Sequence, residues 1–442
     1  MIHIPDEVKT AISTLAANGF EAYIVGGCVR DSLLGGNPKD YDITTSAEPE
    51  EVEKIFGNFR VIETGIKHGT VTVLINKMPL EITTFRIDSD YSDNRHPENV
   101  TFTKSLEEDT ARRDFTMNAL AYNDERGICD FYGGTDDIKN KIIRCVGDAD
   151  KRFGEDALRI MRAIRFSSVL GFEIEENTKR AVFKNKELLR NISSERIASE
   201  LVKLLCGANV RKVLMEYIDV LGVVIPELLP MKGFDQKNIH HIYDVLEHTA
   251  AAVENIEPTP VLRLTALFHD IGKPECFFMK DGQGHFYGHA DIGADMTTKI
   301  LSRLKFDNNT KNTVTKLVKI HDVQIEETDT AVKRCMNKHT PEIFFLLLKM
   351  KRADTLAQSP MCRERLEYLD RLEKRANEII NRKACFSMKD LAVNGNDLIK
   401  LGVKPGKELG NILKHLLEAV IEGKLPNDKN TLIKFTKENY LN

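Results

Sequence analysis

The chain has 442 residues, of which 42% are hydrophobic and 29% charged, and its formal net charge is -4. This composition is typical of a globular protein with roughly two to four domains, and it excludes a uniformly basic nucleic-acid-binding protein. The eight cysteines are scattered without a CxxC pair, which argues against a zinc ribbon or a disulfide framework. The sequence has no signal-peptide pattern and no apolar run near the ~20 residues of a membrane span. We therefore expect a cytoplasmic protein without a membrane partner.

Residues 1–143 predict a mixed α/β domain. Apolar residues recur at helical spacing over Asp6–Asn18, and the pattern ends at Gly19. Short runs rich in β-branched and aromatic residues predict strands at Ala22–Val25, Tyr41–Thr45, Thr70–Ile75, Leu80–Phe85 and Ile128–Tyr132.

From about residue 144 long helical periodicity replaces this pattern. Pro226 and Pro230, followed by Gly233, predict a boundary within the helical region. The sequence thus predicts a multidomain protein in which an α/β part is followed by all-α parts. We place these parts at 1–143, 144–235, 236–365 and 366–442.

The segment YIVGGCVRDSLLGGNPKDYDIT combines features of a nucleotide site. A strand that runs into Gly26-Gly27 and then a helix lets backbone N–H groups approach phosphates, and Arg30 can add a bidentate contact. Residues two apart on a strand point to the same side, so Asp40 and Asp42 can together hold a pair of Mg²⁺ ions. An exposed acidic turn is the alternative for a lone Asp-x-Asp, but the glycines and the arginine upstream favour a metal site.

Two further features extend this hypothesis. A third acidic ligand is expected on a neighbouring strand, and Glu81 in LEITTFR is the candidate, with a solvent-facing strand residue as the alternative. Arg112 and Arg113 are adjacent guanidiniums that suit a triphosphate or a ribose, although such a pair on its own is typical of a basic surface.

Five segments, in this order, resemble the motifs of class II tRNA nucleotidyltransferases and bacterial poly(A) polymerases of the polymerase β superfamily. They are GGCVRDSLLGGNPKDYDITT, RRDFTMNA, DFYGGTDD, EDALRIMRAIRF and SSERIASEL, and together they span about half of the chain. The resemblance implies a polymerase β-like nucleotidyltransferase head with a mixed sheet and helices at 1–143. It also implies a helical neck and body at 144–235 that select the nucleotide and bind tRNA.

The resemblance implies nucleotidyl transfer to the 3′ end of tRNA, with CTP and ATP as substrates and two Mg²⁺ ions as cofactors. The 3′-hydroxyl of the tRNA attacks the α-phosphate of CTP twice and then of ATP, without a nucleic-acid template. Asp40, Asp42 and Glu81 are the expected catalytic residues. The expected nucleotide-binding residues are Gly26, Gly27, Arg30, Arg112, Arg113, Asp114, Asn118, Asp156, Arg159 and Arg162.

The segment EDALRIMR is predicted to be helical and contains the residues expected to select the base. From the residues alone, salt bridges on the helix surface are the plain interpretation. The resemblance implies instead that Asp156 and Arg159 act as a protein template. The carboxylate accepts the exocyclic amine that cytosine and adenine share, and the guanidinium donates to a ring nitrogen or carbonyl.

The segment FRIDSDYSDNRHPENVTF is polar and predicts a mobile loop. It resembles the flexible loop of complete CCA-adding members, which CC-only relatives lack. The resemblance implies that Arg86, Asp88, Arg95 and His96 assist the switch from C to A. A plain long hairpin loop is the alternative.

Residues 236–365 are rich in His and Asp. His248, His269-Asp270 and Asp354 form an H…HD…D pattern that resembles the HD phosphohydrolase superfamily. The resemblance implies that these four residues bind a divalent transition metal or Mg²⁺, which would activate water against a phosphoester. It further implies contributions to an outer or second-metal shell and to phosphate binding from His289, His321 and Lys273. A structural HD domain that only supports the RNA is the alternative.

The tail at 366–442 contains lysines that can contact tRNA phosphates, namely Lys400, Lys404, Lys407 and Lys414, although simple helix packing is also expected there. Three rivals to a CCA-adding enzyme remain. Two are an A-adding specialist and a poly(A) polymerase. The third, of another class, is an HD phosphohydrolase with an inactive RNA-binding head, against which the intact Asp40 and Asp42 argue. No protein partner is evident.

Overall fold

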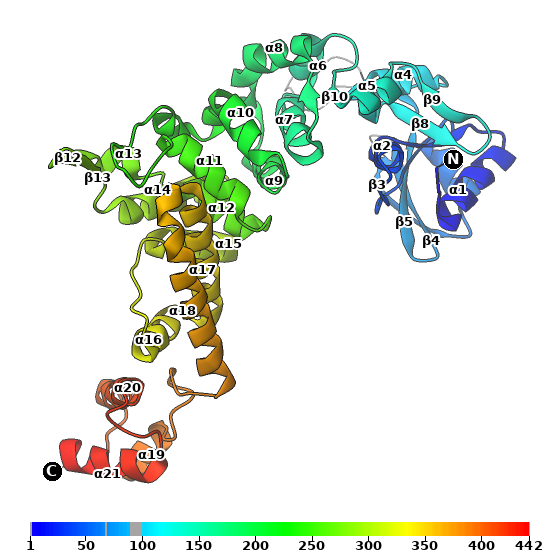
Figure 1. Cartoon of the computed structure of the whole chain (residues 1–442). Coiled ribbons are helices and arrows are strands. Elements are labelled where there is room, and N and C mark those ends of the chain that lie inside the picture. The colour runs from blue at the N-terminus through cyan, green and yellow to red at the C-terminus, as the bar shows by residue number, and fades with distance from the viewer. Residues whose placement is uncertain (1, 67–68, 89–99, 442) are drawn as a thin grey trace. The chain divides into compact units, whose positions relative to one another are not determined.

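The computed structural model describes residues 2–66, 69–88 and 100–441 (Figure 1). These residues form two compact units, Met1–Leu229 (unit 1) and Pro230–Asn442 (unit 2). Each unit has its own core. None of the described helices is both long enough and apolar enough to cross a membrane.

The head of unit 1 is built on a seven-stranded mixed sheet with the order β3-β4-β5-β2-β1-β8-β9. Strands β2 and β5 run parallel, and the other neighbours pair antiparallel. The strands are β1 (Ala22–Val25), β2 (Asp42–Thr45), β3 (Arg60–Gly65), β4 (Thr70–Ile75), β5 (Met78–Thr84), β8 (Leu120–Asn123) and β9 (Gly127–Asp130). Strand β1 is buried throughout. In β2 the first residue, Asp42, is exposed, and the strand is buried from Ile43 onward.

Short helices cover the head sheet. They are α1 (Asp6–Ala17), α2 (Gly27–Leu33), α3 (Pro49–Ile55), α4 (Leu106–Ala111), the 3-10 helix η2 (Thr116–Asn118) and α5 (Gly134–Asn140). In α1 the buried residues Val8, Ala11 and Leu15 share one face, and this face packs against β1 and α3. The small hairpin of β6 (Arg86–Asp88) and β7 (Val100–Phe102) is a separate two-stranded sheet.

The rest of unit 1 is helical and follows the head through a short parallel pair, β10 (Ile142–Ile143) and β11 (Glu173–Ile174). Its helices are α6 (Ala149–Glu155), α7 (Leu158–Leu170), α8 (Glu176–Asn185), η3 (Lys186–Asn191), α9 (Ser194–Leu205), α10 (Val210–Val224) and η4 (Pro226–Met231). Helix α7 packs on α9 and α10, and α6 packs on α8. Most residues of α7 are buried, so its position relative to the head is fixed by packing.

Unit 2 is a helical assembly with one small hairpin (Figure 1). Its elements up to residue 381 are α11 (Val245–Asn255), α12 (Pro260–Phe268), α13 (Lys273–Cys276), β12 (Phe278–Lys280), β13 (Gln283–His285), α14 (His289–Arg303), α15 (Asn308–Ile320), α16 (Asp329–His339), α17 (Pro341–Ala357), η5 (Pro360–Arg363) and α18 (Glu364–Asn381). Helix α11 packs along α17, and α15 packs on α12 and α14. These contacts bring the ends of several helices together.

The last helices of unit 2 enclose a small core of their own. They are α19 (Gly395–Lys400), α20 (Lys407–Ile421) and α21 (Lys429–Tyr440). Leu398, Leu416 and Leu432, one from each helix, are completely buried in this core. The helix-hairpin packing expected for the tail is therefore present.

Six elements predicted for the head are confirmed, with bounds within two residues of those expected: α1, β1, β2, β4, β5 and β9. Strands β3 and β8 were not predicted. Strand β3 (RVIETG) has no clean alternation of apolar and polar residues, and β8 (LAYN) is only four residues long.

One local prediction is wrong, and another is only partly covered by the described residues. The segment EDALRIMR is not one helix, because α6 ends at Glu155 and α7 begins at Leu158, with Asp156 at φ -133° and ψ 102°. The segment expected to be a polar mobile loop begins and ends in strands, since Arg86–Asp88 pairs with Val100–Phe102, as in the hairpin alternative. Residues 89–99 lie outside the described residues, so the mobility of the loop stays a prediction.

Candidate active site and candidate metal centre

The turn between β1 and α2 begins the candidate active site. Gly26 has φ 81°, in the left-handed region that favours glycine. A Cβ at Gly26 would lie 3.0 Å from NH1 of Arg113. The guanidinium of Arg113 therefore packs against the bare backbone of the turn, and backbone N–H groups and a cation meet there, as triphosphate binding requires.

Asp40, Asp42 and Glu81, here called the acidic triad, stand at the edge of two neighbouring strands. Asp42 of β2 pairs in parallel register with Glu81 of β5, and Asp40 lies directly before β2. All three residues are exposed, whereas the next pair in the register, Ile43 and Ile82, is buried. The three residues supply only oxygen ligands, which suit Mg²⁺. The predicted neighbouring strand for Glu81 is confirmed, and its role as a ligand stays a prediction.

The acidic triad is open. Among the described residues, the clusters of three or more His, Cys, Asp or Glu whose ligand atoms lie within 4.8 Å of one another do not include it. The protein surrounding the carboxyl group of Asp42 raises its pKa, although the residue is exposed; the charge of Arg113 opposes this shift and that of Asp40 adds to it. A bound cation would relieve the repulsion between the carboxylates.

A buried carboxylate that the sequence analysis missed holds the arginine pair. Asp109 of α4 is completely buried, lies 2.8 Å from NH2 of Arg112 and 3.8 Å from NH2 of Arg113, and accepts a hydrogen bond from Thr44. Burial alone would raise the pKa of Asp109, but the two guanidiniums outweigh it and lower that pKa. The spacing of Asp109 three and four residues before the arginines was the available signal.

A hydrogen-bonded chain links the predicted nucleotide-binding residues of α2, η2 and α7. NH1 of Arg30 donates to Asn118 Oδ1 (2.6 Å), Asn118 Nδ2 donates to Asp114 Oδ1 (3.0 Å), and Nε of Arg162 donates to Asp114 Oδ2 (2.8 Å). Burial of Asp114 raises its pKa, but Arg162 and Asn118 outweigh it and lower the pKa to about 2. The structure therefore brings four of the predicted residues together in one ordered network.

The two predicted base-selecting residues are each anchored. Asp156 Oδ2 lies 2.8 Å from NH2 of Arg196 on α9, a residue inside the fifth motif that the sequence analysis did not single out. Arg159 is buried, pairs with Glu155 (2.7 Å), and donates from NH2 to the backbone carbonyl of Arg112 (2.7 Å). Arg159 therefore joins α7 to the head next to the arginine pair.

The four residues assigned to the flexible loop are only partly covered by the structure. Arg86 and Asp88 lie in β6, and the backbone N–H of Arg86 donates to buried Asp109 (3.3 Å). Arg95 and His96 lie outside the described residues. The loop's predicted role in the switch from C to A stays a prediction.

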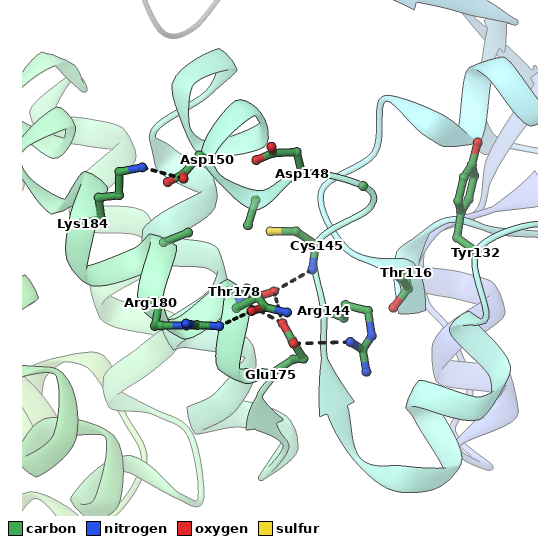
Figure 2. A pocket seen from close by; sticks show the side chains of 14 residues that line it. Thr116, Tyr132, Arg144, Cys145, Asp148, Asp150, Glu175, Thr178, Arg180 and Lys184 are labelled. Atoms are coloured by element: carbon green, nitrogen blue, oxygen red, sulfur yellow. Dashed lines mark hydrogen bonds and ion pairs between the residues drawn. The ribbon is translucent and has the colours of Figure 1, made fainter.

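A polar pocket of about 540 Å³ lies where the head meets α6 and α8 (Figure 2). Lys184 and Asp150 form an ion pair there (2.7 Å), and Thr178 Oγ1 accepts a hydrogen bond from the backbone N–H of Cys145 (3.1 Å). The residues lining this pocket do not include any that the sequence analysis assigned to a site. The ion pair joins α6 to α8, and the Cys145–Thr178 hydrogen bond joins α8 to the segment that follows the head.

In unit 2, six side chains converge at the ends of α11, α12, α14, α15 and α17. They are His248, His269, Asp270, His289, His321 and Asp354, and we call them the histidine centre. Two triplets within it, His248/His269/Asp354 and Asp270/His289/His321, each have ligand atoms within 4.8 Å of one another. The structure thus brings together all four predicted HD ligands and both histidines predicted for an outer or second-metal shell. Asp270, His289, His321 and Asp354 line a cavity of about 470 Å³.

The hydrogen bonds of the four histidines orient them toward one another. Each Nδ1 faces a backbone carbonyl, at Ala357 (3.3 Å), Ala266 (2.7 Å), Phe286 (2.8 Å) and Val318 (2.6 Å). We infer that Nδ1 carries the proton and that Nε2 presents its lone pair to the centre. The Nε2 atoms lie 3.3 Å apart for His248 and His269, and 3.1 Å apart for His289 and His321. Two lone pairs at such distances repel each other unless a proton or a metal ion lies between them, and a set of imidazole nitrogens and carboxylates fits divalent metal ions.

The two carboxylates of the centre also attract positive charge. Burial lowers the pKa of His248, but Asp270 and Asp354 outweigh it and raise that pKa to about 9, whereas burial lowers the pKa of His321 to about 3. Lys273 Nζ lies 2.6 Å from Asp270 Oδ2 and donates to Gln236 (2.8 Å). The ammonium group of Lys273, which was predicted to contact phosphate, is therefore buried and already contacts two protein side chains.

Comparison with known proteins decides the family. The chain is 36% identical to the CCA-adding enzyme of Lactobacillus helveticus (strain DPC 4571), with 98% of each chain covered. It is 34% identical to that of Leuconostoc mesenteroides subsp. mesenteroides, covering 99% of this chain and 96% of the relative. The chain belongs to the CCA-adding enzyme family. The family that the five motifs indicated is thereby confirmed by similarity that covers almost the whole chain.

Family models and solved structures agree with this assignment. The poly A polymerase head domain matches residues 22–144, the RNA and SrmB-binding site model of polymerase A matches 171–231, and tRNA nucleotidyltransferase domain 2 matches 287–436. The structure of the Bacillus stearothermophilus CCA-adding enzyme in complex with CTP is similar, with TM-score 0.74, 30% identity, and 98% and 96% of the two chains covered. The Thermotoga maritima CCA-adding enzyme complexed with tRNA shares the fold, with TM-score 0.59 and 21% identity over 98% of this chain and 94% of that one. The mixed-sheet head followed by helical parts is thus the fold of the CCA-adding enzyme family.

Proposed function

We propose that this member of the CCA-adding enzyme family adds C, C and A to the 3′ end of tRNA from CTP and ATP, without a nucleic-acid template. The observation that carries the proposal is the parallel register of Asp42 with Glu81, next to Asp40 and to the turn that Arg113 contacts. The relative solved with CTP and the relative solved with tRNA support these ligands for this chain.

In this proposal the acidic triad holds two Mg²⁺ ions. When bound, the ions make the 3′-hydroxyl of the tRNA a better nucleophile and neutralise the pyrophosphate that leaves. Arg113 and the backbone of the Gly26 turn orient the triphosphate. The chain of Arg30, Asn118 and Asp114 with Arg162 holds the sugar and excludes other orientations.

Asp156 and Arg159 read the base edge in this proposal. Both residues have spare hydrogen-bonding capacity, since a carboxylate offers about four lone-pair sites and a guanidinium five N–H donors. Arg196 holds the carboxylate of Asp156, and Glu155 with the Arg112 carbonyl holds the guanidinium of Arg159. A pair fixed in this way can accept cytosine and adenine by their shared amine and reject uracil and guanine.

The decisive experiment uses a tRNA transcript that ends at the discriminator base, incubated with Mg²⁺ and labelled CTP, ATP or both. Growth by three nucleotides with both substrates, and no further, supports CCA addition. A single A added only to tRNA ending in CC identifies an A-adding specialist, and a long ladder with ATP alone identifies a poly(A) polymerase. No extension overturns the proposal.

We propose a second activity, a metal-dependent phosphohydrolase, for the histidine centre. The observation that favours it is the grouping of four histidines and two carboxylates into two triplets, with Asp270, His289, His321 and Asp354 open to one cavity. The six residues would hold divalent ions, which when bound supply an activated water and withdraw charge from a phosphoester. A 2′,3′-cyclic phosphate, a 2′-nucleotide and a damaged tRNA end are the candidate substrates.

This second proposal is tested by metal content and by hydrolysis of bis(p-nitrophenyl) phosphate. Wild-type protein is expected to retain metal through gel filtration and to release p-nitrophenol. The variant His269→Ala is expected to lose both properties while adding CCA normally. A wild-type protein that retains no metal would reduce the histidine centre to a structural role.

A further inference from the structure

An aromatic surface lies beside the histidine centre and has no part in the functions proposed so far. It consists of Phe278, His285 and Tyr287, here called the aromatic platform. Phe278 is 40% exposed and Tyr287 is 71% exposed, which is unusual for large rings on a short hairpin. We propose that this platform stacks the base of a nucleotide whose phosphoester lies at the histidine centre.

The pairing of the hairpin places the three rings on one face. Phe278 of β12 lies directly opposite His285 of β13, and Tyr287 follows two residues after His285. The rings of Phe278 and His285 lie 5.5 Å apart with planes at 25°, and those of His285 and Tyr287 lie 5.4 Å apart at 29°. The rings of Phe278 and Tyr287 lie 5.5 Å apart at 49°, so the three rings form a compact cluster in which His285 is stacked with both neighbours. The exposed ring of Tyr287 leaves a flat face on which a further ring can stack.

The hairpin's alternate residues explain why the platform stays open. Phe286 and Phe277, which precede the platform residues Tyr287 and Phe278, pack against each other with ring centroids 5.5 Å apart, and Lys273 lies over Phe286. Gly284 donates its N–H to Lys237 (2.9 Å), and a Cβ there would meet the backbone oxygen of Gln236 at 2.2 Å. The hairpin is therefore clamped on one side, and its exposed aromatic side is held in a fixed position.

The platform is continuous with the histidine centre. His285 and Tyr287 line the same cavity as Asp270, His289 and Asp354. The peptide carbonyl of Phe286, next to Tyr287, accepts the Nδ1 hydrogen bond of His289 (2.8 Å). The cavity is also lined by Arg365, which hydrogen-bonds Gln358 and offers positive charge for a phosphate. A flat apolar surface, a cation and a metal-binding cluster around one cavity fit the three parts of a nucleotide.

The inference rests on the proposed phosphohydrolase function and narrows its substrates to nucleotide phosphoesters, either free nucleotides or the terminal nucleotide of an RNA. In the reaction, water adds to phosphorus, the P–O bond to the leaving alcohol breaks, and that alcohol takes the proton. Because every base has a π face, the platform predicts little preference among bases.

Two esters with the same leaving group separate base binding from chemistry. Metal-loaded full-length protein is assayed with thymidine 5′-(p-nitrophenyl phosphate), which carries a base, and with bis(p-nitrophenyl) phosphate, which carries none. For Tyr287→Leu we expect kcat/KM to fall roughly 5- to 100-fold on the thymidine ester, the range for loss of one base–aromatic stack, mainly through KM. We expect little change on the ester without a base. Tyr287→Phe is expected to retain wild-type values.

Met279→Ala is the matched control, because Met279 is an exposed apolar residue (52%) on the same strand but alternates to the other face. A second measurement does not depend on hydrolysis. Quenching of 2-aminopurine riboside 5′-monophosphate on binding is expected for wild type and Tyr287→Phe, and to be lost in Tyr287→Leu.

The outcomes separate the two ideas. Equal losses on both esters, or unchanged quenching in Tyr287→Leu, overturn the platform. If wild type cleaves neither ester, the phosphohydrolase proposal fails, and the quenching series alone decides whether the platform binds bases. An RNA oligonucleotide with a 2′,3′-cyclic end, if preferred over free 2′,3′-cyclic AMP, identifies RNA ends as the source of the nucleotide; the reverse preference identifies free nucleotides.

Discussion

The acidic triad of the head and the histidine centre of unit 2 are built in opposite ways. Asp40, Asp42 and Glu81 stand exposed on strand edges and do not come together into a cluster of the kind found in unit 2. The residues of the histidine centre are largely buried, and hydrogen bonds to backbone carbonyls fix its imidazoles. In our proposal the head offers an open oxygen site for hydrated Mg²⁺, whereas unit 2 offers a nitrogen-rich site whose ligands are already oriented.

The two regions also differ in which side chains are held in a fixed position by their contacts. In the head, the ordered part is the arginine network, with buried Asp109 and Asp114 as its anchors. In unit 2, the ordered part is the histidine centre itself. This difference fits the two proposals, an open metal site with fixed substrate-holding groups for nucleotidyl transfer and a set of pre-oriented metal ligands for hydrolysis.

The variant Asp42→Ala is expected to have the largest effect, and it tests whether the acidic triad and the histidine centre act independently. We expect nucleotide addition to fall about 10³-fold or more, because a metal ligand supplies several kcal/mol of transition-state stabilisation. The metal content of the histidine centre is expected to be unchanged. Gel-based extension of tRNA and elemental analysis measure the two. Glu63→Ala, which removes an exposed carboxylate on the edge strand β3, is the control; an equal loss there would contradict the assignment.

Asp109→Ala tests whether the head's rigidity lies in its arginine network. Removing this buried partner leaves two guanidiniums without their carboxylate, so we expect a loss of about 3–5 kcal/mol in the free energy of unfolding. Denaturant titration measures it. Asp136→Ala is the matched control, since the Asp136–Lys139 pair has the same spacing but is 75% exposed at both side chains, and we expect a change below about 0.5 kcal/mol. Similar changes in both variants would refute the role of Asp109.

Removal of metal tests whether a metal ion bound at the histidine centre stabilises unit 2. Metal at 100 times its dissociation constant stabilises a protein by about 2.7 kcal/mol, so dialysis against a chelator is expected to lower the Tm of the unit 2 transition by about 5–10 °C. Differential scanning calorimetry measures this shift. In His269→Ala the chelator is expected to have no effect. A chelator-sensitive transition in that variant would place the metal elsewhere.

The variant Arg196→Ala has the smallest expected effect, and it tests whether Arg196 positions the carboxylate of Asp156. Loss of a charged hydrogen-bonded partner costs about 2 kcal/mol, so we expect discrimination of CTP against UTP, measured as a ratio of kcat/KM, to fall roughly 10- to 30-fold. The expected reason is that Asp156 loses its fixed orientation. Arg190→Ala, from an exposed pair with Glu187, is the control. Unchanged selectivity in Arg196→Ala would show that Asp156 needs no positioning.

The sequence by itself determined much of the head. Strand β1, the Gly26 turn and the alternation of Asp40 and Asp42 are local patterns, because residues close in the chain decide them. The H…HD…D spacing likewise pointed to the residues that α11, α12 and α17 bring together. The order of five short motifs was sufficient to indicate the family, which the whole-length comparison then confirmed.

Only the tertiary structure decided which distant residues meet. The register of Asp42 with Glu81, the contact of Arg113 with Gly26 and the bond of Arg196 to Asp156 join residues 39 to 87 positions apart, and no local periodicity encodes them. The break between α6 and α7 at Asp156 has a local and a distant partner, because one carboxylate oxygen accepts the N–H of Leu158 (3.1 Å) and the other is held by Arg196. The aromatic platform likewise exists only because a two-stranded hairpin aligns Phe278 with His285. Side-chain identity set what each residue can do, and packing set what it can reach.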